Sequence, residues 1–173
     1  MKIAQKYSHL NDEEYLIVHH NNLYKEIKEV IASIDADKLR KKISKEKRKI
    51  GISLLSPIEL NEAFNNEFYK RKWEESRYNY YITLNRELME KSVLMSAKEQ
   101  KEFLIANGEK EPIYSYNQTD FVKDKIAVEV QFGKYAFVAF DLFVKHMLFY
   151  SGGVINLGIE ILPTKKMQAQ MSS

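Results

Sequence analysis

Three polar residues near the middle of the chain have the types and spacing of a divalent-cation site. Asp120 lies nine positions before Glu129, and Gln131 follows Glu129 by two. Residues 125 to 132 are rich in β-branched residues, and the polar residues among them alternate with apolar ones, as in a β-strand. Side chains at i and i+2 of a strand point the same way, so Glu129 and Gln131 are predicted to share a face. Together with Asp120 they could hold a divalent cation beside a phosphodiester.

The same spacing also fits an ordinary strand. Acidic residues are common, and a half-exposed strand naturally alternates Glu and Gln with Val. The spacing alone therefore favours a plain strand, and the surrounding sequence must decide.

A dense run of positive charge covers residues 38 to 49, which hold eight basic residues and one acid. Nucleic-acid phosphate commonly neutralises such a run, but a solvated basic helix or loop fits it equally well. No aromatic residue is interleaved, so stacking on single-stranded bases is not indicated.

Length and composition predict one domain, residues 1–173, with a sizeable core, since 45% of the 173 residues are hydrophobic. The absence of cysteine excludes disulfides and thiolate-metal sites. The N-terminus lacks the apolar core of a signal peptide, and no apolar run reaches the roughly 18 residues of a membrane span. We expect a soluble intracellular protein that does not contact a membrane.

The hydrophobic pattern and the capping residues predict alternating helices and strands. The expected helices are Asp12 to about Asp35, Pro57 to about Trp73 after a Ser56 cap, the segment from the Ser96 cap to Asn107, and Phe137 to Tyr150; the expected strands are 78–84, 125–132 and 154–162. The last strand, helix and strand in that order predict a crossover unit in an α/β sheet.

The predicted helix 137–150 is apolar on nearly all sides. Asp141, Lys145 and His146 interrupt it, and the first two can pair at i, i+4. Such a helix must bury more than one face. One face can cover the sheet, and the other either meets a second subunit or completes the core of a monomer. We expect His146 to be a hydrogen-bonded core or interface histidine.

The residues around the carboxylates carry a family resemblance. The segments 115–124 and Val128-Glu129-Val130-Gln131-Phe132-Gly133-Lys134-Tyr135 resemble the type II restriction endonucleases of the BstYI and BglII group, with the closer similarity to BstYI. The resemblance extends over most of the chain, through residues 7–10, 56–57, 60–64, 79–81, 141–147 and 160–163.

The resemblance implies the PD-(D/E)XK nuclease fold, an α/β architecture with a mixed central sheet flanked by helices. It implies a prokaryotic, cytoplasmic homodimer that acts on double-stranded DNA. The expected reaction is Mg²⁺-dependent hydrolysis at a GATC-centred palindrome, with RGATCY as the expected pattern.

The resemblance also assigns the site. Asp120 and Glu129 would bind Mg²⁺ with their carboxylates and Val130 with its backbone carbonyl, all oxygen ligands of the kind that Mg²⁺ prefers. The third catalytic residue is Gln131, where the wider superfamily has lysine. Since an amide carries no charge and cannot act as a base, Gln131 would orient the attacking water by hydrogen bonds.

The DNA contacts are assigned by position. Lys134 would donate to guanine in the major groove, or else contact a phosphate or be a free surface lysine. Ser172 and Ser173 fall where the relatives are expected to have a second recognition segment, and serine suits relaxed reading of an outer base pair. Ser76, with Glu75 beside it, is expected at the end of the preceding helix, where it would help to hold water at the cation site or be a plain polar helix end.

The relatives are expected to continue for one or two more elements past the segment matching residues 171–173, so we expect this chain to lack them. The leading hypothesis is an active dimeric endonuclease. The alternative is a truncated, catalytically inactive module that still binds specific DNA. A third reading, a structural protein with no nucleic-acid role, requires the basic run to be idle.

Overall fold

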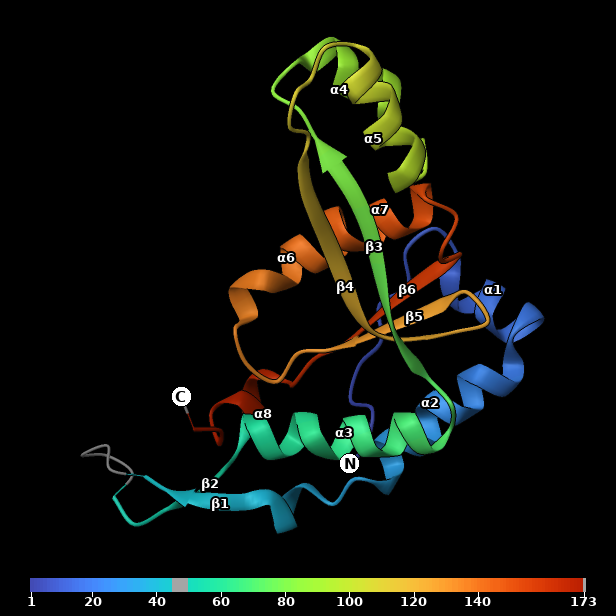
Figure 1. Ribbon diagram of the computed structural model, residues 1–173. Helices are drawn as coiled ribbons and strands as arrows, with labels where there is room; N and C mark the ends of the chain where they lie inside the picture. Colours follow the sequence, from blue (N-terminus) through green and yellow to red (C-terminus); the bar gives the residue numbers. More distant parts are fainter. Residues whose placement is uncertain (45–49, 173) are drawn as a thin grey trace. The chain divides into compact units, whose positions relative to one another are not determined.

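A computed structural model describes residues 1–44 and 50–172 of the chain (Figure 1). The chain forms two compact units, and each is built from segments that are distant in sequence. Unit 1 comprises Met1–Glu74, Val130–Val138 and Glu160–Ser173, and unit 2 comprises Glu75–Glu129 and Ala139–Ile159. In the described part of the chain, no helix has the length and apolar character needed to cross a bilayer.

Unit 1 is mainly helical, with a small antiparallel pair of strands, β1 and β2. Its elements are α1 (Asp12–His19), α2 (Asn21–Ser33), η1 (Ala36–Leu39), β1 (Arg40–Ile43), β2 (Ser53–Leu55), α3 (Pro57–Lys70), η2 (Tyr135–Phe137) and α8 (Lys165–Gln168). The single helix predicted from Asp12 to Asp35 is thus two helices. It breaks at His20, whose φ of −135° and ψ of 38° are not helical.

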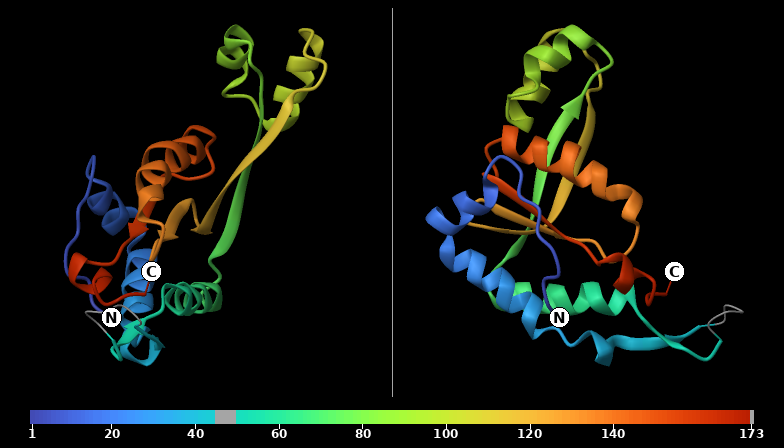
Figure 2. Two further views of the ribbon diagram at one scale, coloured as in Figure 1. Left: turned by 90° about the vertical axis from the view of Figure 1, so that its left-hand side faces the viewer. Right: turned by 180° about the vertical axis from the view of Figure 1, so that it is seen from behind.

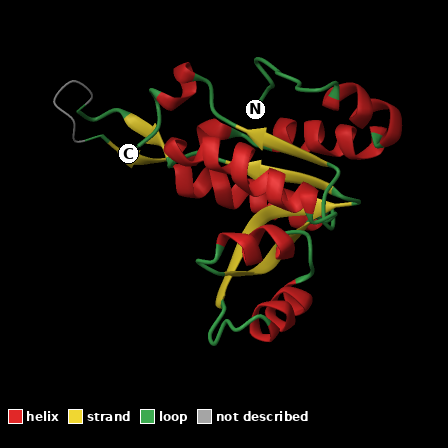
Figure 3. Cartoon of the chain, turned by 90° about the horizontal axis from the view of Figure 1, so that it is seen from above, coloured by secondary structure: helices red, strands yellow, loops and turns green. Residues whose placement is uncertain are grey.

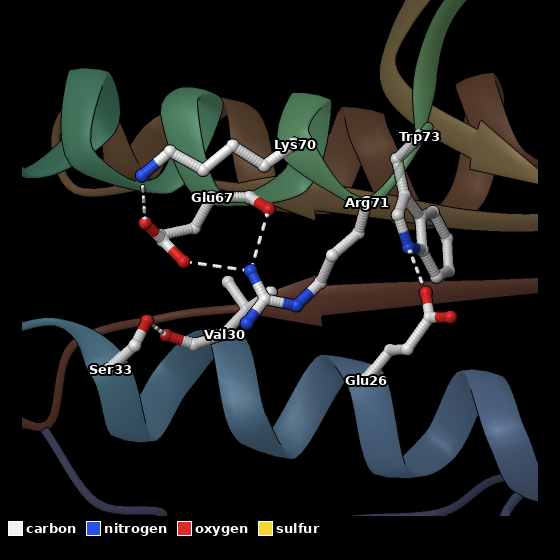
Figure 4. Close-up of polar contacts among 7 residues, drawn as sticks. All are labelled: Glu26, Val30, Ser33, Glu67, Lys70, Arg71 and Trp73. Atoms are coloured by element: carbon white, nitrogen blue, oxygen red, sulfur yellow. Dashed lines mark hydrogen bonds and ion pairs between the residues drawn. The ribbon is translucent and has the colours of Figure 1, made fainter.

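Helices α2 and α3 lie side by side (Figure 4). Each buries apolar side chains at helical spacing. Phe64 and Phe68 of α3 are fully buried, and the ring of Phe64 stacks on Phe132 at 5.2 Å between centroids. The predicted start of α3 is confirmed, because the Ser56 side chain accepts a hydrogen bond from the Glu59 amide.

The buried Trp73 joins the end of α3 to α2. Its indole Nε1 donates to the carboxylate of Glu26 at 3.0 Å (Figure 4). Close to Trp73, the carboxylate of Glu67 accepts hydrogen bonds from Lys70 and Arg71, which stabilise the last turn of α3 (Figure 4). The hydrogen bond from Trp73 to Glu26 satisfies the polar N–H of a fully buried indole.

The elements that lie wholly or mostly in unit 2 are β3 (Glu74–Ile82), α4 (Arg86–Ser92), α5 (Ala97–Ala106), β4 (Ile113–Lys123), β5 (Ile126–Val130), α6 (Val138–Phe140), the π-helical turn η3 (Asp141–Lys145), α7 (His146–Ser151) and β6 (Leu157–Ile161). Strands β3 and β4 are long and paired, and α4 and α5 connect them at one end (Figure 2). The predicted capping box at Ser96 and Glu99 is present at the start of α5.

Four strands form one mixed sheet in the order β3-β4-β5-β6. Strands β3 and β4 are antiparallel, since Arg77 donates to Gln118 and Tyr114 donates to Asn79. These contacts pair later residues of one strand with earlier residues of the other. Strands β4 and β5 are also antiparallel, with Phe121 opposite Val128.

Strands β5 and β6 run parallel. The Asn156 amide donates to the Lys125 carbonyl at 2.7 Å at the start of both strands, and the Gln131 amide donates to the Ile161 carbonyl at 3.0 Å at their end. The helical segment 138–151 connects them, so the predicted crossover unit is confirmed.

A two-residue turn fixes the register between β4 and β5. Asp124 and Lys125 both have positive φ, 47° and 64°, as tight hairpin turns that match strand twist require. Extending the register of Phe121 with Val128 by one step places Asp120 opposite Glu129. The turn therefore brings the two predicted carboxylates together.

In unit 2 the helical segment 138–151 packs on the sheet through Phe149 (helices are red and strands yellow in Figure 3). Phe149 is fully buried there with Ala127 and Ile155, and its ring lies 5.9 Å from that of Tyr78. This packing fixes the direction in which the polar residues of the segment point.

Candidate active site

Glu129 is a buried carboxylate that receives three protein hydrogen bonds on one oxygen. Its side chain lies in β5, and the residue is 4% exposed. The Oε1 atom accepts from the hydroxyl of Thr119, from the Asp120 amide at 3.1 Å and from Lys145 Nζ at 2.9 Å. Donors from strand β4 and from the helical segment 138–151 therefore meet at the single oxygen Oε1 of Glu129.

Lys145 reaches Glu129 from the π-helical turn. A second carboxylate, Asp141, lies 2.8 Å from the same ammonium, as the i, i+4 pairing predicted. Both residues are buried. Burial acts to lower the pKa of Lys145, but the hydrogen bonds and charges of Asp141 and Glu129 exceed that effect and raise it, so the lysine is charged.

Burial raises the pKa of Glu129 to about 7, and the negative charge of Asp120 adds to the rise, while Lys145 and the hydrogen bonds oppose it. Two carboxylates are therefore close enough to repel one another on adjacent strands. A cation between them would relieve that repulsion.

The donor set fits a hard divalent cation. In the described part of the chain, every hydrogen bond to the Glu129 side chain falls on Oε1, which leaves Oε2 available as a ligand. Asp120 supplies a second carboxylate, and the carbonyl of Val130 is the next backbone oxygen along β5. Among the described residues, no group of three or more His, Cys, Asp or Glu side chains is arranged so that all could bind one metal ion. The remaining ligands would be water, which Mg²⁺ retains readily.

His146 is buried beside this site and packs closely against Gly158. Burial, together with the positive charge of Lys145, lowers the pKa of His146 to about 4, while the charge of Asp141 opposes the shift. The imidazole is therefore neutral near pH 7. Its burial agrees with the core position that was predicted, and its hydrogen bond stays a prediction.

The family model described as Restriction endonuclease BglII/BglIII matches residues 4–173 of this chain. The chain belongs to the BglII/BglIII restriction endonuclease family. The mixed sheet and its covering helices confirm the α/β architecture expected for this family.

One solved structure similar to this chain is the crystal structure of restriction endonuclease BglII complexed with a DNA 16-mer. The identity is 20% and the TM-score 0.47, over 88% of this chain and 61% of that chain. This BglII/BglIII-family chain thus spans about three fifths of the length of that relative. A comparison with curated protein sequences gives no match.

Gln131 of this BglII/BglIII-family chain lies just beyond the end of β5 and therefore outside the strand in which it was predicted. Strand β5 ends at Val130 and is buried at all five positions, so the alternation predicted over 125–132 does not extend to Gln131. The Gln131 Nε2 atom donates to the Lys134 carbonyl at 3.1 Å, within the turn that follows. Its role in orienting water stays a prediction.

The predicted DNA-reading residues lie in unit 1. Lys134 is exposed and adopts a left-handed backbone, with φ of 48°, at the start of η2. The Ser172 amide donates to the Leu55 carbonyl at 2.9 Å, which fixes the C-terminal segment beside β2. Ser173 lies outside the described residues. None of these contacts tests the predicted base reading.

The positions of Glu75 and Ser76 correct one expectation. Both lie in β3, because α3 already ends at Lys70, so neither is at a helix end. The Glu75 carboxylate accepts from Gln118 at 2.6 Å, two residues before Asp120 along β4. Glu75 thus belongs to the cross-strand pairing of β3 and β4.

Part of the basic run is neutralised by the chain itself. Its first members pair with acids: Lys38 with Asp35 at 3.4 Å, Arg40 with Asp37 at 2.9 Å and Lys41 with Glu59 at 2.7 Å. These pairs agree with the solvated alternative, but Arg40–Ile43 form strand β1 and not the predicted helix or loop. Residues 45–49, which hold four further basic residues of the run, lie outside the described part.

Lys145 and Thr119 are site residues that sequence reasoning did not assign. The signal for Lys145 was its i, i+4 spacing from Asp141 in an otherwise apolar helix, which predicted the pair but neither its burial nor its third member, Glu129. Thr119 directly precedes Asp120, and its contact with Glu129 becomes evident only from the pairing of β4 with β5.

Proposed function

We propose that this chain contains the catalytic part of a Mg²⁺-dependent type II restriction endonuclease. The substrate would be duplex DNA with a GATC-centred palindrome, RGATCY being the expected pattern. The observation that carries the proposal is the pair of carboxylates, Asp120 and Glu129, on adjacent strands of a BglII/BglIII-family chain. A closer relationship to BstYI and a prokaryotic cytoplasmic location stay predictions.

The chain's own residues would divide the work as follows. Asp120, Glu129 and the Val130 carbonyl would hold Mg²⁺, which supplies water activation and charge neutralisation at the phosphate. Gln131 would hold the attacking water in line with the phosphorus by hydrogen bonds. Because a neutral amide takes up no proton near pH 7, the proton must pass to a phosphate oxygen or to solvent.

We propose a homodimer because a two-fold symmetric enzyme matches a palindrome and cuts both strands with two equivalent sites. Exposed apolar side chains on the helical segment of unit 2 support this. Phe143 is 74% exposed, Met147 59% and Tyr150 61%. A second subunit that covers them would bury the outer face of this apolar helix.

The test of the proposal is digestion of a plasmid that carries GATC-containing sites, with and without Mg²⁺, followed by sequencing of the fragment ends. We expect discrete fragments that end within RGATCY and require the cation. If no fragment forms at any protein concentration, the proposed activity of this chain is wrong.

A truncated DNA-binding module without catalysis is the other outcome to distinguish. Gel-shift measurements in Ca²⁺, which takes the same oxygen ligands as Mg²⁺, report binding without cleavage. A specific shift in Ca²⁺ with no cut in Mg²⁺ would support the module and reject the enzyme.

The substitution Glu129→Ala separates the two roles at residue level. We expect cleavage to be lost while the gel shift on the cognate duplex is largely kept, since the carboxylate is assigned to the cation and not to base reading. Equal loss of binding and cleavage would contradict that assignment.

A further inference from the structure

The environment of Glu129 is asymmetric. One carboxylate oxygen, Oε1, accepts from Thr119, from the Asp120 amide and from Lys145, and these donors come from both β4 and the π-helical turn. Three donors on one oxygen fix the rotation of the carboxylate about its last bond. The second oxygen, Oε2, is thereby directed away from these donors.

The lysine that makes this contact is itself held. The carboxylate oxygen Oδ1 of Asp141 lies 2.8 Å from Lys145 Nζ. The two residues, Asp141 and Lys145, are only 6% and 9% exposed. A buried ammonium that pairs with two carboxylates has little freedom to move. It therefore acts as a fixed donor to Glu129.

We propose that Lys145 is a positioning residue which, with Thr119, holds the Glu129 carboxylate so that Oε2 serves as the ligand of the divalent cation. This inference rests on the proposed function, because it concerns the same site. The helical segment brings the ammonium of Lys145 to the Glu129 carboxylate, and Thr119 reaches the same oxygen from β4.

The charges at the site are compatible with this role. The single ammonium of Lys145 offsets only part of the negative charge of Asp120, Glu129 and Asp141. Lys145 therefore orients one carboxylate without removing the attraction of the site for a divalent cation. Residues that orient a metal ligand in this way typically change metal affinity by about 10- to 100-fold when they are replaced.

The experiment measures Mn²⁺ binding to the full chain without DNA, from the electron paramagnetic resonance signal of the free ion. The variant Lys145→Met removes the ammonium and keeps most of the side-chain length. We expect its Mn²⁺ dissociation constant to rise by about 10- to 100-fold. The matched control, Lys98→Met, makes the same chemical change at an exposed position of α5 and should bind Mn²⁺ as the wild type does.

Two further variants keep the test decisive if Lys145→Met fails to fold. Thr119→Val removes another donor to the same oxygen at nearly constant shape, and it should weaken Mn²⁺ binding in the same direction. Lys145→Arg retains a donor and a charge, and it should recover part of the lost affinity. Thermal melting without metal shows which variants are folded.

The outcomes separate this inference from the proposed function. A folded Lys145→Met protein with wild-type Mn²⁺ affinity overturns the positioning role, even if it melts at a lower temperature, because that result is purely structural. Unchanged affinity in Thr119→Val overturns it equally. Absence of Mn²⁺ binding in the wild type, or wild-type binding by Glu129→Gln, would instead overturn the proposed cation site.

Discussion

Lys145 Nζ lies 2.8 Å from Asp141 Oδ1, so one buried ion pair spans the π-helical turn of unit 2. The pair follows the i, i+4 spacing of helix surfaces, but here it faces the sheet. Its ammonium is shared with Glu129, which makes the turn part of the carboxylate site.

Replacement of Asp141 by Asn should destabilise the protein. The change leaves a buried ammonium with one carboxylate in place of two, and the expected loss is about 1–3 kcal/mol in the free energy of unfolding. Urea denaturation measures it. Glu90→Gln breaks the exposed pair with Arg86 and is the control, with an expected change below about 0.5 kcal/mol. Equal effects of the two variants would contradict the buried character of the Asp141 pair.

The pH dependence of stability should contain two opposing contributions. Glu129 has its pKa raised from 4.5 to about 7, so between these values the folded state keeps a proton that the unfolded state has released, and stability falls as pH rises. His146 has its pKa lowered from 6.5 to about 4, so over that range the unfolded state binds the extra proton, and stability rises with pH.

Single variants should separate these contributions in urea denaturation between pH 4 and 8 without divalent cations. With Glu129→Gln the remaining trend is the rise from His146. With His146→Gln the remaining trend is the fall from Glu129. Profiles parallel to that of the wild type in both variants would show that neither pKa is shifted by folding.

Gly158 should not tolerate a side chain. A Cβ atom at this position of β6 would overlap the imidazole ring of His146, which is buried and cannot move aside freely. We expect Gly158→Ala to lower the free energy of unfolding by about 1–3 kcal/mol. Gly133→Ala is the matched control, because its Cβ would meet Pro57 at an ordinary 3.8 Å.

The single tryptophan allows a test of the predicted single domain. Trp73 is fully buried in unit 1, whereas Gly158 lies in unit 2. If residues 1–173 unfold as one cooperative domain, Gly158→Ala should shift the urea midpoint of Trp73 fluorescence as much as that of circular dichroism. An unchanged fluorescence midpoint would show that the two units unfold separately.

Lys134 provides a test of base reading. We expect Lys134→Ala to weaken binding to the cognate duplex by about 1–3 kcal/mol and to random DNA by less. Gel shifts over a range of salt concentrations in Ca²⁺ measure both, with Lys98→Ala as the surface control. A uniform loss on all sequences, with a smaller salt dependence, would make Lys134 a phosphate contact.

Local signals in the sequence predicted much of the fold. Caps at Ser56 and Ser96 are satisfied by neighbouring residues, so α3 and α5 begin where expected. The apolar segment 137–150 is helical, although the π-helical turn within it has no signature in residue type. His20 ends α1 without a Gly or Pro, which is why one long helix was predicted in place of two.

The site depended on pairings that no local pattern encodes. Strand β4 was missed because its tyrosines, asparagine and glutamine lack a clear alternation, yet it carries Asp120 and Thr119. The contact of Lys145 with Glu129 arises only when the helical segment packs on the sheet. Residue type and spacing singled out the carboxylates and the resemblance favoured them as a site, whereas their hydrogen-bond partners required the tertiary structure.

The tight turn at Asp124 and Lys125 has a consequence for how this chain can change. Side chains in a strand alternate between faces, so an insertion or deletion that shifts the register by one residue would turn a carboxylate to the opposite side of the sheet. The number of residues in the turn is therefore as decisive for the pairing of Asp120 with Glu129 as the acids themselves. Related chains that keep both acids are expected to vary the residues of this turn but not its length.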